Sequence, residues 1–314
     1  MKTVYITTMM IMSVLMLLIP LAAKNNLVSI PVSAVVEQEE QPRETVKVWM
    51  SASAKTVEYS VEDYIFGVVS AEMPALYEEE ALKAQAVAAY TYYLVQKEGN
   101  KNKDYDITDD YNLDQAFISP EKAAEKWGDS AEKYGSKIRS AVKSVLGKRV
   151  TYNGKNATTL YHAISFGVTE KASEVWGGDY PYLVSVDSSF DKLNENYAVT
   201  TTIDAQGVKE KLAGLVEIKD VSANCFGEIT RTEAGGVKTI LVAGSKLSGS
   251  DVRKALGLRS ANFDVSFANG KYNFSTKGYG HSIGMSQYGA HYMAMQGKTY
   301  EEILLHYYSG CKIE

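Results

Sequence analysis

The stretch VEDYIFGVVSAEMP, residues 61–74, carries the strongest folding signal in the chain. Its apolar side chains recur every three or four residues, at Val61, Tyr64, Ile65, Val68 and Val69. This spacing predicts a helix with one buried face, and Pro74 predicts that the helix ends close by. Glu72 would then lie at the end of the helix, beside apolar neighbours.

A glutamate in that position has two interpretations. Partial burial would disfavour the charged form and raise the pKa of Glu72, and a raised pKa suits a general acid near neutral pH. The alternative is a surface carboxylate at a helix end, which is the commoner case for this local context. The residues around Glu72 do not by themselves decide between these interpretations.

Further helices and strands are predicted outward from this stretch. The alternation in residues 45–49 predicts a half-buried strand, and Glu78 to Glu80 predict the start of a second helix that runs through Leu94 and stops near Gly99. Loop and helix are expected over 104–147. Strands are expected at 149–152 and 182–186.

The C-terminal half reads as strand-rich, with a marked helix at its end. Gly235 and Gly236 before residues 239–242 predict a hairpin, and a short helix is expected over 247–256. Thr299 and Glu302 form a capping-box pattern for a last helix. We therefore expect an α+β fold, a single mixed domain over 45–314, with a β-rich insertion at about 195–274.

The first 24 residues predict a membrane segment. The run from Val4 to Ala23 has no charged side chain and, at roughly 20 residues, is long enough to cross a bilayer as one helix. A cleaved signal peptide is the alternative, because Ala22 and Ala23 are small. The segment length favours an uncleaved anchor, followed by a polar tether over residues 25–44. Either alternative places the domain outside the cytoplasm.

Composition excludes some classes of function. The formal net charge of -5 argues against a protein that coats nucleic acid, which needs a basic surface. Neither of the two cysteines, Cys225 and Cys311, has metal-site spacing, and they are expected either to pair or to remain thiols. The four histidines include no HExxH pattern, so no zinc hydrolase, metal ion or cofactor is expected. The G-x-S-x-G pattern of serine hydrolases is also missing.

Residues 280–290, GHSIGMSQYGA, are the second candidate site segment. The glycines around His281 let the backbone approach a partner closely, and Ser286 can cap a following helix. A polysaccharide groove and a tightly packed turn would both use these features. The 22 tyrosines and 3 tryptophans favour a sugar partner, although core packing is the commoner use of an aromatic ring.

Several segments, taken together and in order, resemble the stage II sporulation protein D family. They are EDYIFGVV (62–69), AEMP (71–74), EALKAQAVAA (80–89), VWGGDYPYLVSV (175–186), LSGSDVRKALGLRS (247–260) and residues 280–290. The resemblance extends from about Val46 to Tyr308, which is nearly the whole predicted domain.

The resemblance implies a membrane-anchored lytic transglycosylase that cleaves septal peptidoglycan while the mother cell engulfs the forespore. Its implied partners are peptidoglycan glycan strands and the stage II sporulation proteins P and M, at the outer face of the mother cell's engulfing membrane. The family's catalytic glutamate corresponds to Glu72. Substrate-binding residues are expected among Gln85, Tyr90, His162, Ser165, Trp176, Tyr182, His281, Ser286 and Gln287.

This sequence departs from the family pattern at three points. Tyr90 stands where the family commonly has Arg, a side chain that can pair with a carboxylate through two hydrogen bonds. Residues 164–167 read ISFG instead of TSGG, and Ser282 follows His281 where the family has Gly. Some relatives hold zinc near the position of His162, but no cysteine lies near it here, so no zinc is expected. A related branch enhances an autolytic amidase, which leaves a non-catalytic glycan-binding protein as the alternative function; a purely structural septal protein is a third.

Overall fold

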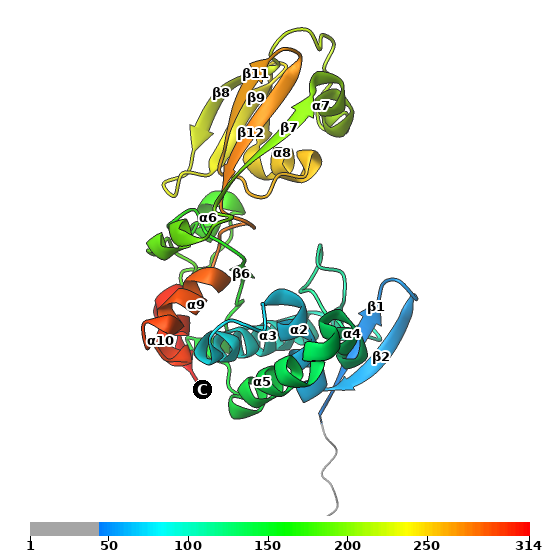
Figure 1. The fold of residues 1–314 in the computed structure, drawn as a ribbon, viewed down its shortest axis with the longest axis vertical. Coiled ribbons are helices and arrows are strands. Elements are labelled where there is room, and N and C mark those ends of the chain that lie inside the picture. Colours follow the sequence, from blue (N-terminus) through cyan, green and yellow to red (C-terminus); the bar gives the residue numbers. More distant parts are fainter. Residues whose placement is uncertain (1–43) are drawn as a thin grey trace, which may run out of the picture. The chain divides into compact units, whose positions relative to one another are not determined.

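The computed structural model describes residues 44–314, which form one unit. The predicted anchor at 1–24 and all of the predicted tether except Glu44 lie outside the described residues. Among the helices of residues 44–314, none combines the length and the hydropathy that a membrane-spanning segment requires. The described chain is a mixed α+β protein with several small sheets (Figure 1).

Two groups of elements follow each other along the chain. The first group is β1 (Thr45–Met50), β2 (Lys55–Ser60), α2 (Val61–Glu72), α3 (Glu79–Gly99), β3 (Ile107–Thr108), α4 (Pro120–Trp127), α5 (Ala131–Ser144), β4 (Val150–Tyr152), β5 (Lys155–Asn156), β6 (Tyr161–His162) and α6 (Ala172–Val175). The second group is β7 (Ala198–Asp204), α7 (Ala205–Leu212), β8 (Phe226–Arg231), β9 (Val237–Val242), β10 (Ser245–Ser248), α8 (Gly249–Leu256), β11 (Phe263–Ala268) and β12 (Lys271–Lys277). The chain then returns to the first group with β13 (Met285–Ser286), α9 (Gln287–Met295), α10 (Tyr300–Tyr307) and β14 (Lys312–Ile313). Two short 3-10 turns complete the fold, at Gly128–Ser130 and Ser189–Leu193.

Helix α2 forms where the apolar spacing predicts it. The Ser60 side chain accepts a hydrogen bond from the Asp63 backbone N–H at 3.1 Å and so caps the first turn. Tyr64, Ile65, Val68 and Val69 are buried on its inner face. The backbone turns extended at Met73, directly before Pro74, and this ends the helix at Glu72. The predicted helix is confirmed.

A first hydrophobic cluster is built around α3, which packs against α2, α5, α9 and α10. Small side chains on α3, such as Ala84 and Ala88, are fully buried and let these helices come close. Three small sheets border the helices, in the strand orders β2-β1-β3, β14-β4-β5 and β13-β6. The parallel pair β13-β6 brings Ser286 beside His162, although more than a hundred residues separate them in the chain.

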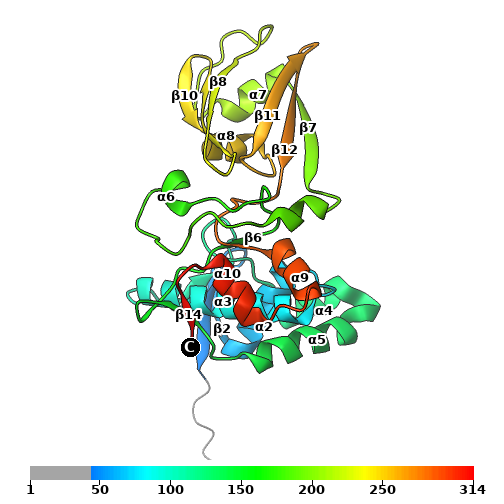
Figure 2. The same cartoon turned by 90° about the vertical axis from the view of Figure 1, so that its left-hand side faces the viewer.

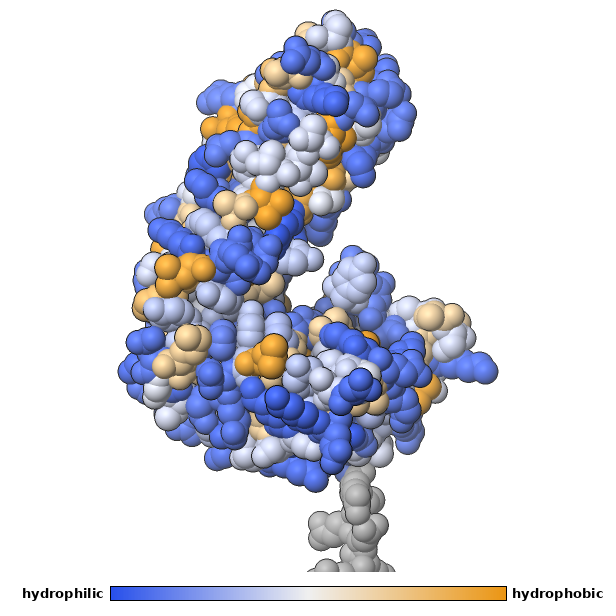
Figure 3. Space-filling view, in the orientation of Figure 1, coloured by the Kyte–Doolittle hydropathy of each residue, from blue (hydrophilic) through white to orange (hydrophobic). Residues whose placement is uncertain are grey.

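A second hydrophobic cluster lies entirely within residues 203–274. It is formed by the sheets β11-β12-β7 and β10-β9-β8 together with α7 and α8, which lie against them (Figure 2). Its entry and exit are adjacent, because Ala198 pairs with Lys277 in the β7-β12 ladder. The face shown in Figure 3 is mostly hydrophilic over both groups of elements, with hydrophobic residues in small groups.

Most of the other predicted elements are also present. The hairpin at Gly235 and Gly236 joins β8 to β9, and Thr299 and Glu302 form the predicted capping box of α10. The short helix α8 starts at Gly249, because Leu247 and Ser248 belong to β10.

The strand predicted at 182–186 is wrong. Residues 182–186 form no strand and hydrogen bond irregularly. The Ala172 N–H donates to the Leu183 carbonyl, while the Val186 N–H donates to the Thr169 side chain. A side chain in place of a backbone carbonyl breaks the ladder that a strand requires.

Candidate active site

Glu72 is held between two hydrogen-bond donors from distant parts of the chain. Its Oε1 accepts the backbone N–H of Ala116 at 2.8 Å, and its Oε2 accepts from Gln287 Nε2 at 3.5 Å. Burial raises the pKa of Glu72 above its ordinary value, and the two hydrogen bonds only partly oppose this effect. The side chain is therefore a carboxyl group whose protonated form is favoured at higher pH than in water.

Gln287 and Gln85 form a polar pair behind this carboxyl group. Gln287 is the first residue of α9, and its Nε2 also donates to Gln85 Oε1 at 3.3 Å. Gln85 lies fully buried on α3, and its Nε2 has no hydrogen-bond partner among residues 44–314. A buried NH2 group without an acceptor is uncommon in proteins, so the NH2 group of Gln85 is an unused hydrogen-bond donor beside the site.

The segment that presents Ala116 is anchored by its neighbour Gln115. Gln115 Nε2 donates to the Tyr64 hydroxyl at 2.8 Å and to the Ala89 carbonyl at 3.3 Å. Its Oε1 accepts from the Tyr161 hydroxyl at 2.7 Å. Gln115 is buried, and both the oxygen and the nitrogen of its side-chain amide are hydrogen bonded. These bonds hold the backbone at residue 115 and therefore fix the position of the neighbouring Ala116 N–H.

Helix α9 is positioned by a buried carboxylate, Asp191. The Ser286 hydroxyl donates to Asp191 Oδ1 at 2.9 Å and accepts the Gly289 N–H at 3.1 Å, so it caps α9 as predicted. Asp191 Oδ2 accepts the Ser165 backbone N–H at 2.8 Å and the Ser188 hydroxyl at 3.0 Å. Ser165 and Ser286 thus support the helix that carries Gln287.

His162, His281 and Trp176 form a row of rings. The His162 and His281 centroids are 5.7 Å apart, and those of His281 and Trp176 are 5.2 Å apart. His162 is buried and Trp176 is half exposed, so the row leads from the interior to the surface. Burial lowers the pKa of His281 to about 4, and it also holds the pKa of His162 well below its ordinary value, so both rings are neutral at pH 7. Gly280 permits this arrangement because it has a φ of +112° and a Cβ there would lie 2.7 Å from His162 Cβ.

Two predicted binding residues lie in other surroundings. The Tyr182 hydroxyl accepts the Thr158 N–H at 2.8 Å, and its ring packs against Tyr152. Tyr90 packs against Tyr93, with Glu44, Lys97 and Arg149 as its charged neighbours. Five residues separate it from Gln85, which puts the two side chains about 140° apart around α3. Their roles in substrate binding stay predictions.

Several residues that position Glu72 and α9 are not predicted from the sequence. Gln115, the Ala116 N–H and Asp191 are joined to the site by contacts with distant parts of the chain, and no local sequence pattern marks them. Both cysteines are free thiols in the structure. Within residues 44–314, no group of three or more His, Cys, Asp or Glu side chains is placed to hold a metal ion.

The fold and the site thus define an α+β protein in which Glu72, partly buried, lies between two amide donors. Comparison with known proteins shows the family. A family model described as stage II sporulation protein matches residues 51–152. The chain is 37% identical to stage II sporulation protein D of Bacillus amyloliquefaciens over 86% of this chain and 78% of the relative. It is 36% identical, with the same coverage, to stage II sporulation protein D of Bacillus subtilis.

The chain therefore belongs to the stage II sporulation protein D family. It is also 30% identical to a protein of Bacillus subtilis named amidase enhancer, over 78% of this chain and 39% of that relative.

Proposed function

We propose that this protein is a lytic transglycosylase of peptidoglycan that acts during sporulation, with Glu72 as both general acid and general base. The observation that carries the proposal is the burial of Glu72 with two amide donors and a raised pKa. A carboxyl group with a raised pKa keeps its proton to higher pH than an ordinary glutamate and can give it to a glycosidic oxygen. Membership of a sporulation family supports the biological setting.

One carboxyl group is enough for this reaction because the substrate supplies the nucleophile. Ordinary glycosidases need a second carboxylate to activate water or to attack the sugar. In the proposed reaction, Glu72 gives its proton to the glycosidic oxygen as the bond from C1 of muramic acid breaks. The C6 hydroxyl of the same sugar forms the new bond to C1, and Glu72 takes the proton from that hydroxyl. Glu72 ends as it began, and no water is consumed.

The proposed setting is the outer face of the mother cell's engulfing membrane. The uncharged run from Val4 to Ala23 supports an anchor there. The partners we propose are septal glycan strands and the stage II sporulation proteins P and M. Membership of the family and the N-terminal sequence support these proposals.

Replacing Glu72 with Gln tests the catalytic role. Glu72→Gln keeps the size of the side chain and one of its two acceptor oxygens but cannot transfer the proton. We expect glycan-strand cleavage to fall by at least about a thousandfold, since general acid and base steps contribute 10²–10⁴ each. The control is Glu125→Gln, an exposed glutamate on α4, which should cleave like the parent. Retained cleavage by Glu72→Gln would refute the catalytic proposal.

The second candidate function is a non-catalytic glycan binder that stimulates a cell-wall amidase. The relative named amidase enhancer favours it. In that case the parent protein alone would release no glycan fragments, and both it and Glu72→Gln would raise the rate of an added amidase equally.

A further inference from the structure

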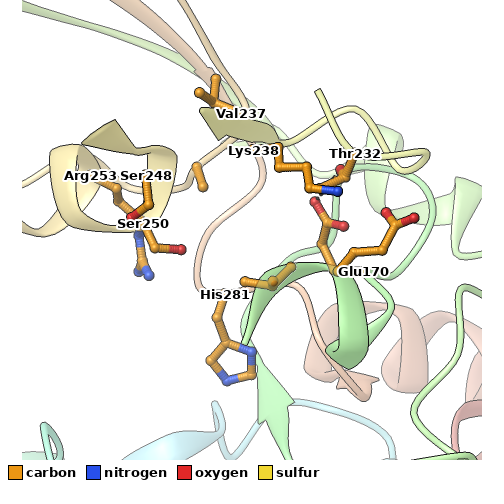
Figure 4. Close-up of a pocket in the computed structure, with 11 residues that line it drawn as sticks. Glu170, Thr232, Val237, Lys238, Ser248, Ser250, Arg253 and His281 are labelled. Carbon is orange, nitrogen blue, oxygen red and sulfur yellow. Dashed lines mark hydrogen bonds between the residues drawn. The ribbon is translucent and has the colours of Figure 1, made fainter. Parts of the chain in front are cut away.

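A buried donor without an acceptor lies next to the glutamine that holds Glu72. In the described part of the chain, Gln85 Nε2 is one of several buried side-chain atoms that have no hydrogen-bond partner. Two others, Arg253 Nε and Glu170 Oε2, belong to residues that line the small polar pocket in Figure 4. Gln85 differs from them, because its amide oxygen is bonded to Gln287, which donates to Glu72. Its unused donor is therefore part of the candidate active site.

The two glutamines meet at the NH2 group of Gln287. Its Nε2 donates to Glu72 Oε2 at 3.5 Å and to Gln85 Oε1 at 3.3 Å, so both of its N–H groups have acceptors. This arrangement suits an ionised Glu72, because a carboxylate only accepts hydrogen bonds. It leaves the NH2 group of Gln85 without an acceptor, although Gln85 is fully buried. The ionised state of Glu72 therefore leaves one buried donor group unsatisfied, which is unfavourable.

A protonated Glu72 needs the opposite arrangement. Its Oε1 accepts from the Ala116 N–H at 2.8 Å, so the proton belongs on Oε2, which faces Gln287. A hydroxyl group there requires an acceptor, and Gln287 provides one only when its amide turns and Oε1 takes the place of Nε2. Gln85 must then turn as well, because two amide oxygens that face each other both accept. The turned Gln85 places its NH2 group against Gln287 Oε1, and the unused donor gains an acceptor.

Both amides can turn in place. The oxygen and the NH2 group of a glutamine side chain exchange positions by rotation about its last torsion, which has a broad and roughly two-fold preference. Gln115, the other glutamine near Glu72, cannot do the same. Its Nε2 donates to the Ala89 carbonyl at 3.3 Å, and a turned amide would set its oxygen against that carbonyl. Rotation is therefore open to the pair of Gln85 and Gln287 and closed to Gln115.

The other ionisable groups on the surrounding elements have partners of their own. Those on α2, on α3, on α9, before α4 and before α9 are hydrogen bonded or paired elsewhere: Asp63, Lys83, His291, Asp114 and Asp191. Tyr161 of β6 senses the charge of Glu72, but burial holds the pKa of Tyr161 well above its ordinary value and the group stays neutral. The pKa of Glu72 is therefore governed by its burial and its amide donors.

We infer that Gln85 is a positioning residue, which turns together with Gln287 when Glu72 gains or loses its proton. The inference rests on the proposed function, in which Glu72 is acid and base within one cycle. The pair offers Glu72 Oε2 a donor in the ionised state and an acceptor in the protonated state. The bond to the carboxylate is the stronger of the two, so Gln287 still lowers the pKa of Glu72 on balance.

Replacing Gln85 tests the pair through activity. Gln85→Met keeps the length of the side chain and removes both polar groups. We expect kcat for strand cleavage to fall at least about tenfold with KM changed by less than about twofold, because Gln85 is buried away from the substrate. In a Gln287→Leu background the same change should have no further effect, since the pair is already broken. Thr91→Val, at another fully buried polar residue of α3, is the matched control and should lower stability but not kcat.

A nuclear magnetic resonance titration of the full-length chain in detergent micelles tests the rotation without substrate. As the pH falls and Glu72 takes up its proton, the NH2 protons of Gln85 gain an acceptor and should move downfield. Those of Gln287 lose a carboxylate and should move upfield with the same midpoint. Both changes should vanish in Glu72→Gln. The NH2 protons of Gln115, whose amide cannot turn, are the internal control and should shift far less.

Three results would overturn the inference. They are NH2 protons of Gln85 that do not titrate with Glu72, a Gln85→Met variant that cleaves like Thr91→Val, and losses from Gln85→Met and Gln287→Leu that multiply in the double variant. A raised KM with unchanged kcat in Gln85→Met would also overturn it, since that result would make Gln85 a substrate-binding residue. The titration uses the parent chain, so it decides the question even if Gln85→Met does not fold. A parent protein that titrates as expected but releases no glycan fragments would count against the proposed function only.

Discussion

Glu72 owes its chemistry to the residues that surround it in space rather than in sequence. The Ala116 N–H and Gln287 hold its two oxygens, while burial raises its pKa. The two donors favour the carboxylate and the burial favours the acid. A group balanced in this way can give up a proton and take it back within one reaction cycle.

Replacing Gln287 should shift the pH dependence of cleavage. Gln287→Leu removes a donor that lowers the pKa of Glu72, so that pKa should rise further. Because the acid form of Glu72 starts the reaction, the alkaline limb of the profile of kcat/KM against pH should move up by as much as about one pH unit. Gln296→Leu, at the other end of α9, is the control. An alkaline limb that stays in place, or moves to lower pH, would contradict this role.

Glu170 should make the stability of the fold depend on pH. Its pKa is raised from 4.5 to about 7, so its folded form holds a proton more tightly than its unfolded form. The resulting stabilisation is fully present below pH 4.5 and is lost as the pH rises through 7. The loss amounts to roughly 3 kcal/mol, at 1.36 kcal/mol per pKa unit. Chemical denaturation at a series of pH values should show this decline in the parent and a flatter curve in Glu170→Gln; parallel curves would contradict it.

Element starts and ends are what the sequence predicts best. Pro74 ends α2, Thr299 and Glu302 cap α10, and Ser286 caps α9, because each depends on residues within one turn. The same local logic failed at residues 182–186, where Thr169 supplies a side chain to a would-be strand. Local patterns also do not identify Gln115 or Asp191, because the partners that tie them to the site, Tyr161 and Ser286, lie 46 and 95 residues away. Local sequence patterns therefore predict that Glu72 lies at the end of its helix, but they do not predict which residues surround it.

The cap of α9 should matter for both stability and activity. Ser286→Ala removes the hydrogen bonds to Gly289 and Asp191, at a cost of about 1–2 kcal/mol in unfolding free energy. It also frees the helix that presents Gln287 to Glu72, so cleavage should fall beyond what reduced stability explains. Ser119→Ala, which uncaps α4, is the matched control. The stability of Ser119→Ala should also fall. At a temperature where both variants stay folded, however, Ser119→Ala should cleave glycan like the parent protein. Equal cleavage by the two variants would contradict the positioning role of Ser286.

At the scale of the whole described molecule, two hydrophobic clusters share no residue. The first contains no side chain from 198–277, and the second lies wholly inside that range. The two ends of the range are neighbours, since Ala198 pairs with Lys277 and the Gly278 N–H bonds to the Tyr197 carbonyl at 2.7 Å. This arrangement is what an insertion into an existing fold would leave.

Removing residues 198–277 should therefore leave a foldable protein. With Tyr197 joined to Gly278 through a short glycine linker, the first cluster keeps all its members, and Glu72 keeps Ala116 and Gln287. We expect a cooperative thermal transition and helical circular dichroism. A shortened chain without a cooperative transition would show that the first cluster depends on the second.

The central claim is that Glu72 cleaves glycan without water. Mass spectrometry of strands digested by the parent protein in heavy-oxygen water tests it most directly. We predict fragments with anhydromuramic ends, each lighter by one water than a hydrolysis product and free of heavy oxygen. Reducing ends that carry heavy oxygen would identify a hydrolase, and intact strands would leave the protein without the activity proposed for it.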